Sequence, residues 1–199
     1  MKMTTSGTEI NKNHRGASVN KTAEMTKMAL MVAMNCVSAY IIIPLPFSLS
    51  PLALQTLIVN LTGYVLNAKQ AFMTMLVYLL VGLAGVPVFT GGSAGPGKLF
   101  GPTGGYIIGF LFSALVMWAM ESLWGKKPVI QILSMVVGLI VCYAMGTIWF
   151  MVVYTRTTGA VGIGTVLGWC VIPFIIPDLV KIALAFVLSR RVRKLVPMQ

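Results

Sequence analysis

Long apolar stretches follow one another along most of this 199-residue chain, separated only by single charges or short charged clusters. They cover residues 28–68, 70–97, 99–120, 128–155 and 157–177. A helix needs about 20 mostly apolar residues to cross the hydrocarbon core of a bilayer. Each stretch is therefore long enough to cross a bilayer, and the first is long enough to cross it twice. Because 57% of the residues are hydrophobic and only 10% are charged, we expect an all-α, polytopic membrane protein.

The hydropathy pattern predicts six transmembrane helices, with both termini in the cytoplasm. We place these helices at about 24–43, 52–67, 70–86, 103–124, 128–150 and 173–193. In this arrangement twelve of the fifteen basic residues lie on the inner side, and the outer connections hold only Lys98 and Arg156. Cytoplasmic segments of membrane proteins carry such an excess of Lys and Arg. The polar residues 1–22 are predicted to form a flexible cytoplasmic arm, and residues 23–199 a single membrane domain.

The connections on the two sides of the predicted bundle differ in length and composition. The inner turns, 67–69 and 125–128, are short, whereas the outer connections, 44–51, 86–102 and 151–172, are long and rich in Gly and Pro. Long loops that are not hydrophilic are hard to explain as solvated tethers. We expect them to fold back over the bundle, above a binding site that opens to the outside.

Small residues recur at four-residue spacing within the predicted helices. The sets are Ala29 and Ala33; Gly101, Gly105 and Gly109; and Gly138, Cys142 and Gly146. Small residues at this spacing let helix backbones approach closely in lipid. We expect ordinary helix packing at most of these positions.

The net charge of +11 does not indicate a nucleic-acid partner, because membrane topology explains where the basic residues lie. Cys36, Cys142 and Cys170 lie in or beside apolar segments and are expected to be buried hydrophobes rather than disulfide or zinc ligands. His14, the single histidine, lies in the polar arm. We therefore expect no metal site, no cofactor and no enzymatic function.

An acid–base pair, Asp178 and Lys181, lies inside the last apolar segment. The chain has only four acidic residues, and the other three lie in the arm or at helix ends. Ionisable residues at membrane depth are costly and usually face an internal cavity or a substrate path. Because positions i and i+3 share one helix face, these two residues are predicted to bind a small amphipathic solute. The alternative is a purely structural ion pair.

Glycines dominate the second outer connection, in the block GVPVFTGG at 85–92 and in GPTGGY at 101–106. Such a backbone can approach a ligand closely, and Pro102-Thr103 suits the start of a helix whose free N–H groups meet a polar ligand atom. The alternative is a well-packed loop. Residues 92–98 also match the first seven positions of a phosphate-binding loop, but Leu99 stands where Ser or Thr is required, so we do not expect nucleotide binding.

The block GVPVFTGGSAGPGKLFGPTGGYIIGF at 85–110, followed by Pro177-Asp178-x-x-Lys181, resembles the BioY family. These proteins are the biotin-specific substrate-binding subunits, or S components, of energy-coupling factor (ECF) transporters. The resemblance extends over nearly the whole chain from about Thr22. It implies a multi-pass protein of a prokaryotic cell membrane that captures biotin beneath the three outer loops.

The resemblance also implies particular site residues and partners. The expected biotin-binding residues are Asp178, Lys181, Tyr106, Phe89, Gly91, Gly92, Thr103 and Gly104. Asp178 is expected to accept an N–H of the ureido ring, and Lys181 to donate to the ureido oxygen or to the carboxylate. Ala29 and Ala33 resemble the motif through which S components contact a membrane coupling protein (EcfT- or BioN-like), which works with two cytoplasmic ATPases (EcfA- or BioM-like).

The chain departs from the family pattern in the glycine-rich loop. Phe100 stands where many members have a small polar or amide residue, and Pro96 and Lys98 are inserted nearby. Lys98 or backbone N–H groups near Thr103 are therefore candidates for binding the valerate carboxylate. The alternative functions are an S component for another vitamin, an intramembrane enzyme and a stand-alone channel.

Overall fold

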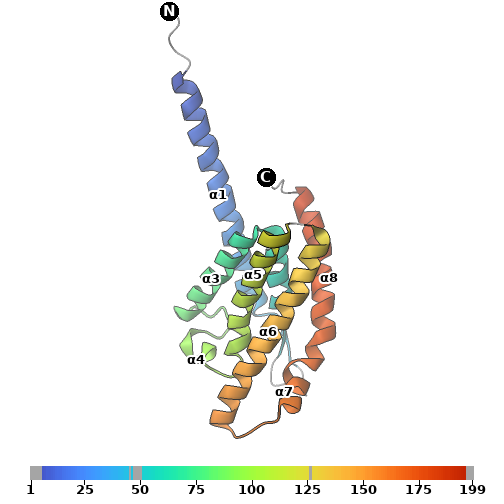
Figure 1. The fold of residues 1–199 in the computed structure, drawn as a ribbon. Helices are drawn as coiled ribbons and strands as arrows, with labels where there is room; N and C mark the ends of the chain where they lie inside the picture. Colours follow the sequence, from blue (N-terminus) through green and yellow to red (C-terminus); the bar gives the residue numbers. More distant parts are fainter. Residues whose placement is uncertain (1–5, 45, 47–50, 126, 196–199) are drawn as a thin grey trace, which may run out of the picture.

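The computed structural model describes residues 6–44, 46, 51–125 and 127–195, and it is almost entirely helical (Figure 1). Its elements, in chain order, are α1 (Ser6–Ser38), β1 (Ile42–Ile43), β2 (Leu52–Ala53), α2 (Gln55–Val65), α3 (Ala68–Leu83), α4 (Gly95–Leu99), α5 (Gly104–Trp124), α6 (Pro128–Thr157), α7 (Ile163–Cys170) and α8 (Ile172–Leu195). The two strands form an antiparallel pair in which Ile42 faces Ala53 and Ile43 faces Leu52.

A helix is present at each of the six predicted positions, namely α1, α2, α3, α5, α6 and α8, and α2 is the shortest of these with 11 residues. The structure differs from the sequence prediction in the outer connections, where the β1–β2 pair and the short helices α4 and α7 were not predicted. In addition, α6 continues past the predicted end at 150 to Thr157. The expected arm at 1–22 overlaps α1, which begins at Ser6.

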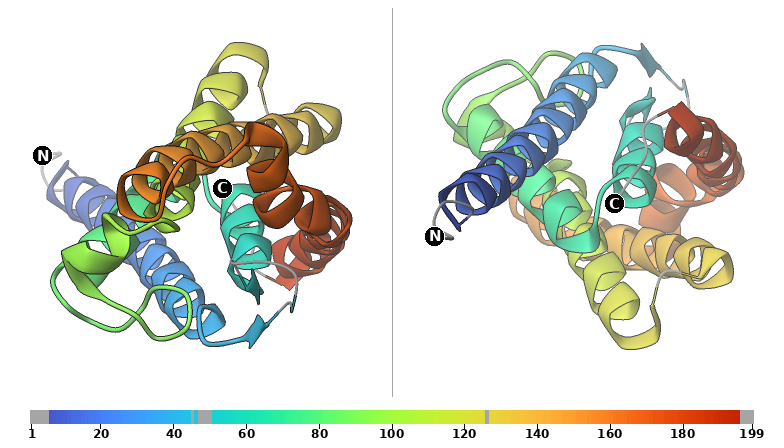
Figure 2. Two further views of the ribbon diagram at one scale, coloured as in Figure 1. Left: turned by 90° about the horizontal axis from the view of Figure 1, so that it is seen from below. Right: turned by 90° about the horizontal axis from the view of Figure 1, so that it is seen from above.

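Among the described residues, three helical segments are long and apolar enough to cross a bilayer by themselves: 104–124, 128–157 and 163–192. The 16-residue α3 is also apolar but shorter. The 11-residue α2 is about 16 Å long, which is well short of the hydrocarbon thickness. Ten of its eleven residues are buried. α2 is therefore an internal helix that packs most extensively against α8 and lies between α8 and α1 (Figure 2).

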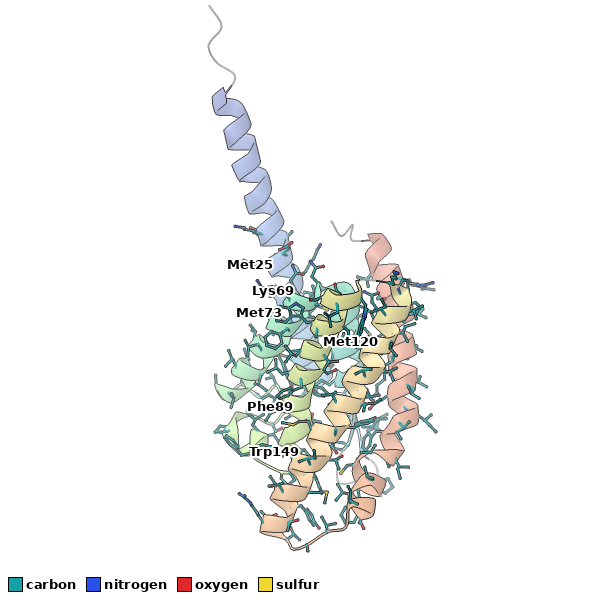
Figure 3. All side chains as sticks on the ribbon, viewed as in Figure 1. Met25, Lys69, Met73, Phe89, Met120 and Trp149 are labelled. Atoms are coloured by element: carbon teal, nitrogen blue, oxygen red, sulfur yellow. The ribbon has the colours of Figure 1, made fainter. Side chains whose placement is uncertain are left out.

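The start of α1, the end of α8 and the short α2–α3 and α5–α6 turns lie at one end of the bundle, whereas α4 and α7 lie at the other (Figure 1). Met25 and Lys69 mark the first end, and Phe89 and Trp149 lie toward the second (Figure 3). The predicted outer connections at 86–102 and 151–172 thus lie at the same end of the bundle, which carries α4 and α7. The connection predicted at 44–51 falls largely outside the described residues.

Close packing of α5 against α6 depends on glycines. A Cβ at Gly109 would lie 3.2 Å from the Cα of Cys142, and one at Gly138 would lie 2.4 Å from the hydroxyl of Ser113. The side chain of Trp149 similarly occupies the space beside Gly105. The predicted rows of small residues on α5 and α6 therefore pack these helices against each other, whereas Ala29 and Ala33 on α1 are exposed.

One face of α8 points into the bundle and the opposite face is apolar and exposed. The buried residues recur at helical spacing: Phe174, Asp178, Lys181, Ile182, Ala185 and Ser189. The exposed ones are Ile175, Ile176, Leu179, Val180, Leu184, Val187 and Leu188. This pattern is typical of a helix with one side toward lipid, and it places the acid–base pair in the interior.

Candidate ligand-binding site

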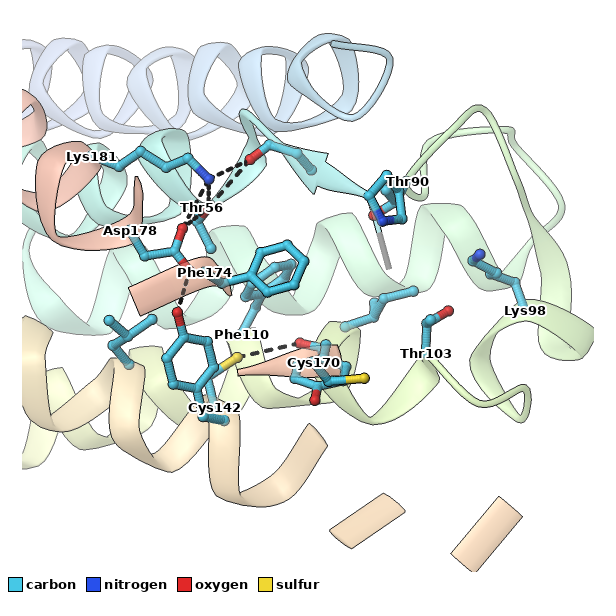
Figure 4. A pocket seen from close by; sticks show the side chains of 16 residues that line it. Thr56, Thr90, Lys98, Thr103, Phe110, Cys142, Cys170, Phe174, Asp178 and Lys181 are labelled. Carbon is cyan, nitrogen blue, oxygen red and sulfur yellow. Dashed lines mark hydrogen bonds and ion pairs between the residues drawn. The ribbon is translucent and has the colours of Figure 1, made fainter. Parts of the chain in front are cut away.

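A cavity lies beneath the loops at the α4 and α7 end, between α2, α5, α6 and α8 (Figure 4). Its described lining residues are Pro51, Ala53, Thr56, Thr90, Lys98, Thr103, Tyr106, Ile107, Phe110, Leu139, Cys142, Tyr143, Cys170, Phe174, Asp178 and Lys181. The space between these atoms is about 720 Å³, including the part open to solvent. Of this space, about 90 Å³ is open to the centre of a water-sized sphere, below the roughly 300–1,000 Å³ of typical small-molecule sites. The cavity is therefore narrow in this structure.

Asp178 and Lys181 form a buried ion pair at one end of the cavity. The Lys181 ammonium lies 2.8 Å from Oδ1 of Asp178, and the two residues are 7% and 3% exposed. Lys181 also donates to the backbone oxygen of Ala53 at 2.7 Å and to the hydroxyl of Thr56 at 2.8 Å. An ammonium has three N–H donors, so all of them have acceptors. Lys181 thereby links α8 to strand β2 and to the first turn of α2.

The Asp178 carboxylate is held by residues from three helices. Thr56 on α2 lies 3.1 Å from Oδ1, which Lys181 on α8 also contacts, and the hydroxyl of Tyr143 on α6 donates to Oδ2 at 2.6 Å. A carboxylate has about four lone-pair sites, two on each oxygen. The three observed donors leave one site on Oδ2. Asp178 can therefore accept one further N–H without losing a partner.

Aromatic and aliphatic side chains line the middle of the cavity. Phe174 on α8 comes one helical turn before Asp178, and Phe110 on α5 comes one turn after Tyr106. The hydroxyl of Tyr106 lies 3.5 Å from that of Thr147 on α6. The ring of Tyr106 occupies the space beside Gly146, where a Cβ would lie 2.3 Å from it. The sequence prediction that Tyr106 lines a pocket agrees with this position.

Four of the predicted site residues lie near the cavity but are not among its lining residues: Phe89, Gly91, Gly92 and Gly104. Phe89 is fully buried, with its ring edge-on to that of Tyr78 at a centroid distance of 5.8 Å. Gly91, with a φ of 75°, donates its N–H to the backbone oxygen of Ala39 at 2.9 Å. These residues shape the loop, whereas the neighbouring Thr90 lines the cavity.

Gly104 lets α4 pack onto the start of α5. A Cβ at this position would lie 1.6 Å from the backbone oxygen of Leu99, the last residue of α4. Thr103, the residue before it, lines the cavity. Any side chain at 104 would therefore displace α4 from the cavity wall.

A buried chain of hydrogen bonds fixes the glycine-rich loop to the helices beneath it. Gln55 at the start of α2 donates to the hydroxyl of Tyr78 at 2.5 Å and accepts from Thr90 at 3.3 Å. Tyr78 in turn donates to the backbone oxygen of Val88 at 3.0 Å. Gln55 precedes Thr56, so the first turn of α2 connects this loop with the ion pair.

Several lining residues were not identified from the sequence, namely Thr56, Tyr143, Phe110, Phe174 and Cys142. Thr56 and Tyr143 are polar residues within apolar segments, and Phe174 lies at i−4 from Asp178 on the same helix face. These signals are present in the sequence but are weaker than a charge. In the described part of the chain, no three His, Cys, Asp or Glu side chains come together as a metal site.

Comparison with known proteins places the chain in a family over nearly its whole length. A sequence profile of the BioY family matches residues 8–198. The chain is 35% identical over 173 residues to a probable biotin transporter BioY of Pyrococcus horikoshii, which covers 87% of this chain and 98% of that protein. It is 33% identical over 174 residues to the biotin transporter BioY of Thermotoga maritima, covering 86% and 96% of the two chains.

A solved structure has the same fold. The crystal structure at 2.1 Å of the S-component for biotin from an ECF-type ABC transporter matches with a TM-score of 0.75 and 27% identity, covering 88% of this chain and 93% of that one. The resemblance noted in the glycine block and the Asp–Lys motif is thus confirmed by the family profile and by these relatives. The chain belongs to the BioY family.

Proposed function

We propose that this chain is the biotin-binding membrane subunit of a biotin uptake transporter. The observation that supports the proposal most directly is the buried Asp178–Lys181 pair in the wall of a cavity beneath the loops, in a chain related to proteins named as biotin transporters. The pair lies on the inward face of an apolar helix. Burying charges in that position is costly, and such residues in membrane proteins usually face a ligand site or a substrate path.

The free lone-pair site on Oδ2 of Asp178 accepts one N–H of the ureido ring. Lys181 donates to the ureido oxygen by exchanging one of its present acceptors, such as the backbone oxygen of Ala53. Such an exchange would couple ligand binding to strand β2. The fused rings then pack between Tyr106, Phe110 and Phe174, all of which line the cavity. Hydrogen bonds to charged partners contribute about 1.5–3 kcal/mol each.

The residues of the glycine-rich loop act mainly as a scaffold in this proposal. Thr103 lines the cavity and contacts the ligand directly. Phe89, Gly91, Gly92 and Gly104 hold the loop and α4 in position without lining the cavity.

The proposed membrane arrangement is six helical segments with both termini in the cytoplasm, formed by α1, α2, α3, α5, α6 and α8, of which α2 is short and buried inside the bundle. Two observations support it: the twelve inner basic residues, and the position of the α1 start and the α8 end at the same end of the bundle. Residues 23–199 form the membrane domain of a prokaryotic cell membrane, and residues 1–22 a cytoplasmic arm. The cavity then opens to the outside.

Uptake requires partners that supply energy. We assign that role to a membrane coupling protein and two cytoplasmic ATPases, with contact through the α1 surface that carries Ala29 and Ala33. Both alanines are exposed on α1. Small exposed residues at this spacing allow a partner helix to approach closely.

Purification in detergent followed by mass spectrometry of the co-purifying small molecules tests the assignment. Biotin is expected, and titration of the ligand-free protein should give saturable one-to-one binding that excess riboflavin or thiamine does not displace. Displacement by another vitamin would instead indicate an S component of different specificity. Recovery of chemically altered biotin would indicate an enzyme.

A further inference from the structure

Lys98 is a second cation in the wall of the cavity, and it lies at the opposite end from the ion pair. Figure 4 shows Lys98 and Thr103 at one end and Asp178 and Lys181 at the other, with Phe174 and Phe110 between them. The cavity therefore has two polar ends separated by an apolar middle. This arrangement suits a ligand with a polar group at each end.

The ammonium of Lys98 has no ion-pair partner among the residues that the structure describes. No described residue accepts a hydrogen bond from it or forms an ion pair with it. The whole chain has only four acidic residues, Glu9, Glu24, Glu121 and Asp178. Asp178 is already paired with Lys181, and Glu121 lies 17 residues beyond the start of α5, about 26 Å along that helix. None of the described residues balances the charge of Lys98, so an anionic group of a ligand can do so.

The backbone that carries Lys98 is held firmly in place. Leu99 beside it is 6% exposed and its backbone oxygen lies against Gly104. On the other side, the indole of Trp149 on α6 donates to the backbone oxygen of Gly101 at 3.0 Å, and its ring stacks on Phe100. A lysine on such an anchored segment is already positioned before a ligand arrives, which reduces the entropy lost on binding.

The formal charges of the lining residues therefore add up to one net positive charge. Asp178 and Lys181 cancel each other, and Lys98 remains. Electrostatic complementarity favours a ligand of opposite charge and disfavours a cationic one. The cavity is matched to a monoanion whose uncharged, hydrogen-bonding head lies at the ion pair.

We infer that Lys98 is a specificity-determining residue, whose ammonium binds the carboxylate tail of the ligand while the Asp178–Lys181 pair binds the head. The inference rests on the proposed function, in which the ligand is biotin. It assigns the carboxylate to Lys98 rather than to Lys181, whose positive charge is already balanced by Asp178 at 2.8 Å. Different elements then bind the two ends of biotin: α8 binds the ureido end and α4 binds the carboxylate end.

The test compares biotin with biotinamide, its neutral carboxamide, by calorimetric titration of the purified full-length protein. Wild type should bind biotin about 10- to 100-fold more tightly than biotinamide, as a charge-assisted hydrogen bond predicts. Lys98→Gln should weaken biotin binding by that factor, leave biotinamide binding unchanged and so abolish the discrimination. Lys98→Arg should retain it. Lys69→Gln, which removes the same charge at the far end of the bundle, should behave as wild type.

Two results would overturn the assignment of the carboxylate to Lys98 but leave the proposed function intact. If Lys98→Gln still prefers biotin over biotinamide by the wild-type factor, Lys98 does not bind the carboxylate. If Lys98→Gln weakens the binding of biotin and of biotinamide equally, Lys98 only supports the loop. If wild type binds neither compound, the proposed function fails, and this assignment fails with it.

Discussion

Tyr143 on α6 and Asp178 on α8 are joined by a 2.6 Å hydrogen bond from the phenol hydroxyl to Oδ2, opposite the oxygen that Lys181 contacts. The carboxylate is thus fixed on both oxygens. Thr56 adds a third helix to the same group. A ligand that binds Asp178 contacts a point where α2, α6 and α8 meet.

Thr56→Val should weaken biotin binding about 10- to 100-fold. The substitution keeps the shape but removes the hydroxyl that lies between Oδ1 of Asp178 and the ammonium of Lys181, at 3.1 and 2.8 Å. Losing hydrogen bonds to charged groups costs about 1.5–3 kcal/mol. Titration with biotin measures the effect, and Thr56→Ser should restore the affinity because it keeps the hydroxyl. Equal affinities for Thr56→Val and wild type would show that the bridge does not matter for binding.

Tyr143→Phe should lower the stability of the ligand-free protein by about 1.5–3 kcal/mol, since it leaves Oδ2 of the buried carboxylate without its donor. Thermal unfolding in detergent, followed with a dye that reacts with the buried thiols of Cys142 and Cys170, measures this loss. Tyr154→Phe on the same helix is the matched control, because no described residue accepts or donates a hydrogen bond at its hydroxyl. Identical melting curves for the two variants would contradict the prediction.

Gly104→Ala should reduce both stability and biotin affinity. The new Cβ would lie 1.6 Å from the backbone oxygen of Leu99, so α4 must move together with Lys98. Overpacking typically costs about 1–3 kcal/mol, and here the clash is with backbone rather than with a flexible side chain. Gly97→Ala in α4 is the control, since nothing lies within 4 Å of its Cβ position. A Gly104→Ala protein with wild-type melting and affinity would show that α4 does not support the site.

The sequence predicts the positions of the main helices well, because each apolar stretch of a membrane protein corresponds to one or two helices. It also singles out Asp178 and Lys181, since charges are rare in such stretches. It does not predict α7 or the β1–β2 pair. Whether these short segments form depends on their packing over the bundle and not on their own periodicity.

The glycine-rich loop shows a second limit of sequence reasoning. Its many glycines indicate that the backbone is closely approached by other atoms. They do not indicate whether those atoms belong to a ligand or to another part of the protein. For Gly104 the neighbour is Leu99, and for Gly82 it is the ring of Phe89. The partners of Asp178 on other helices, Thr56 and Tyr143, are more than 30 residues away in the sequence and become apparent only from the packing.

Lys181→Met alone leaves the buried charge of Asp178 unpaired, and such a change typically costs about 3–5 kcal/mol of stability. The double variant Asp178→Leu/Lys181→Met removes both charges and should recover most of that stability, because apolar replacement of a buried pair is often neutral. If the pair serves mainly to bind the ligand, the double variant should keep its stability but lose its affinity for biotin.

Biotin titration of the double variant therefore tests most directly whether Asp178 and Lys181 bind the ligand. If the pair binds biotin, the double variant folds, melts close to wild type and binds biotin about a hundredfold more weakly, since both charge-assisted contacts to the ureido ring are gone. Wild-type affinity in the double variant would show that the pair does not bind biotin. The ion pair would then be a structural element, and the ligand would bind elsewhere in the cavity.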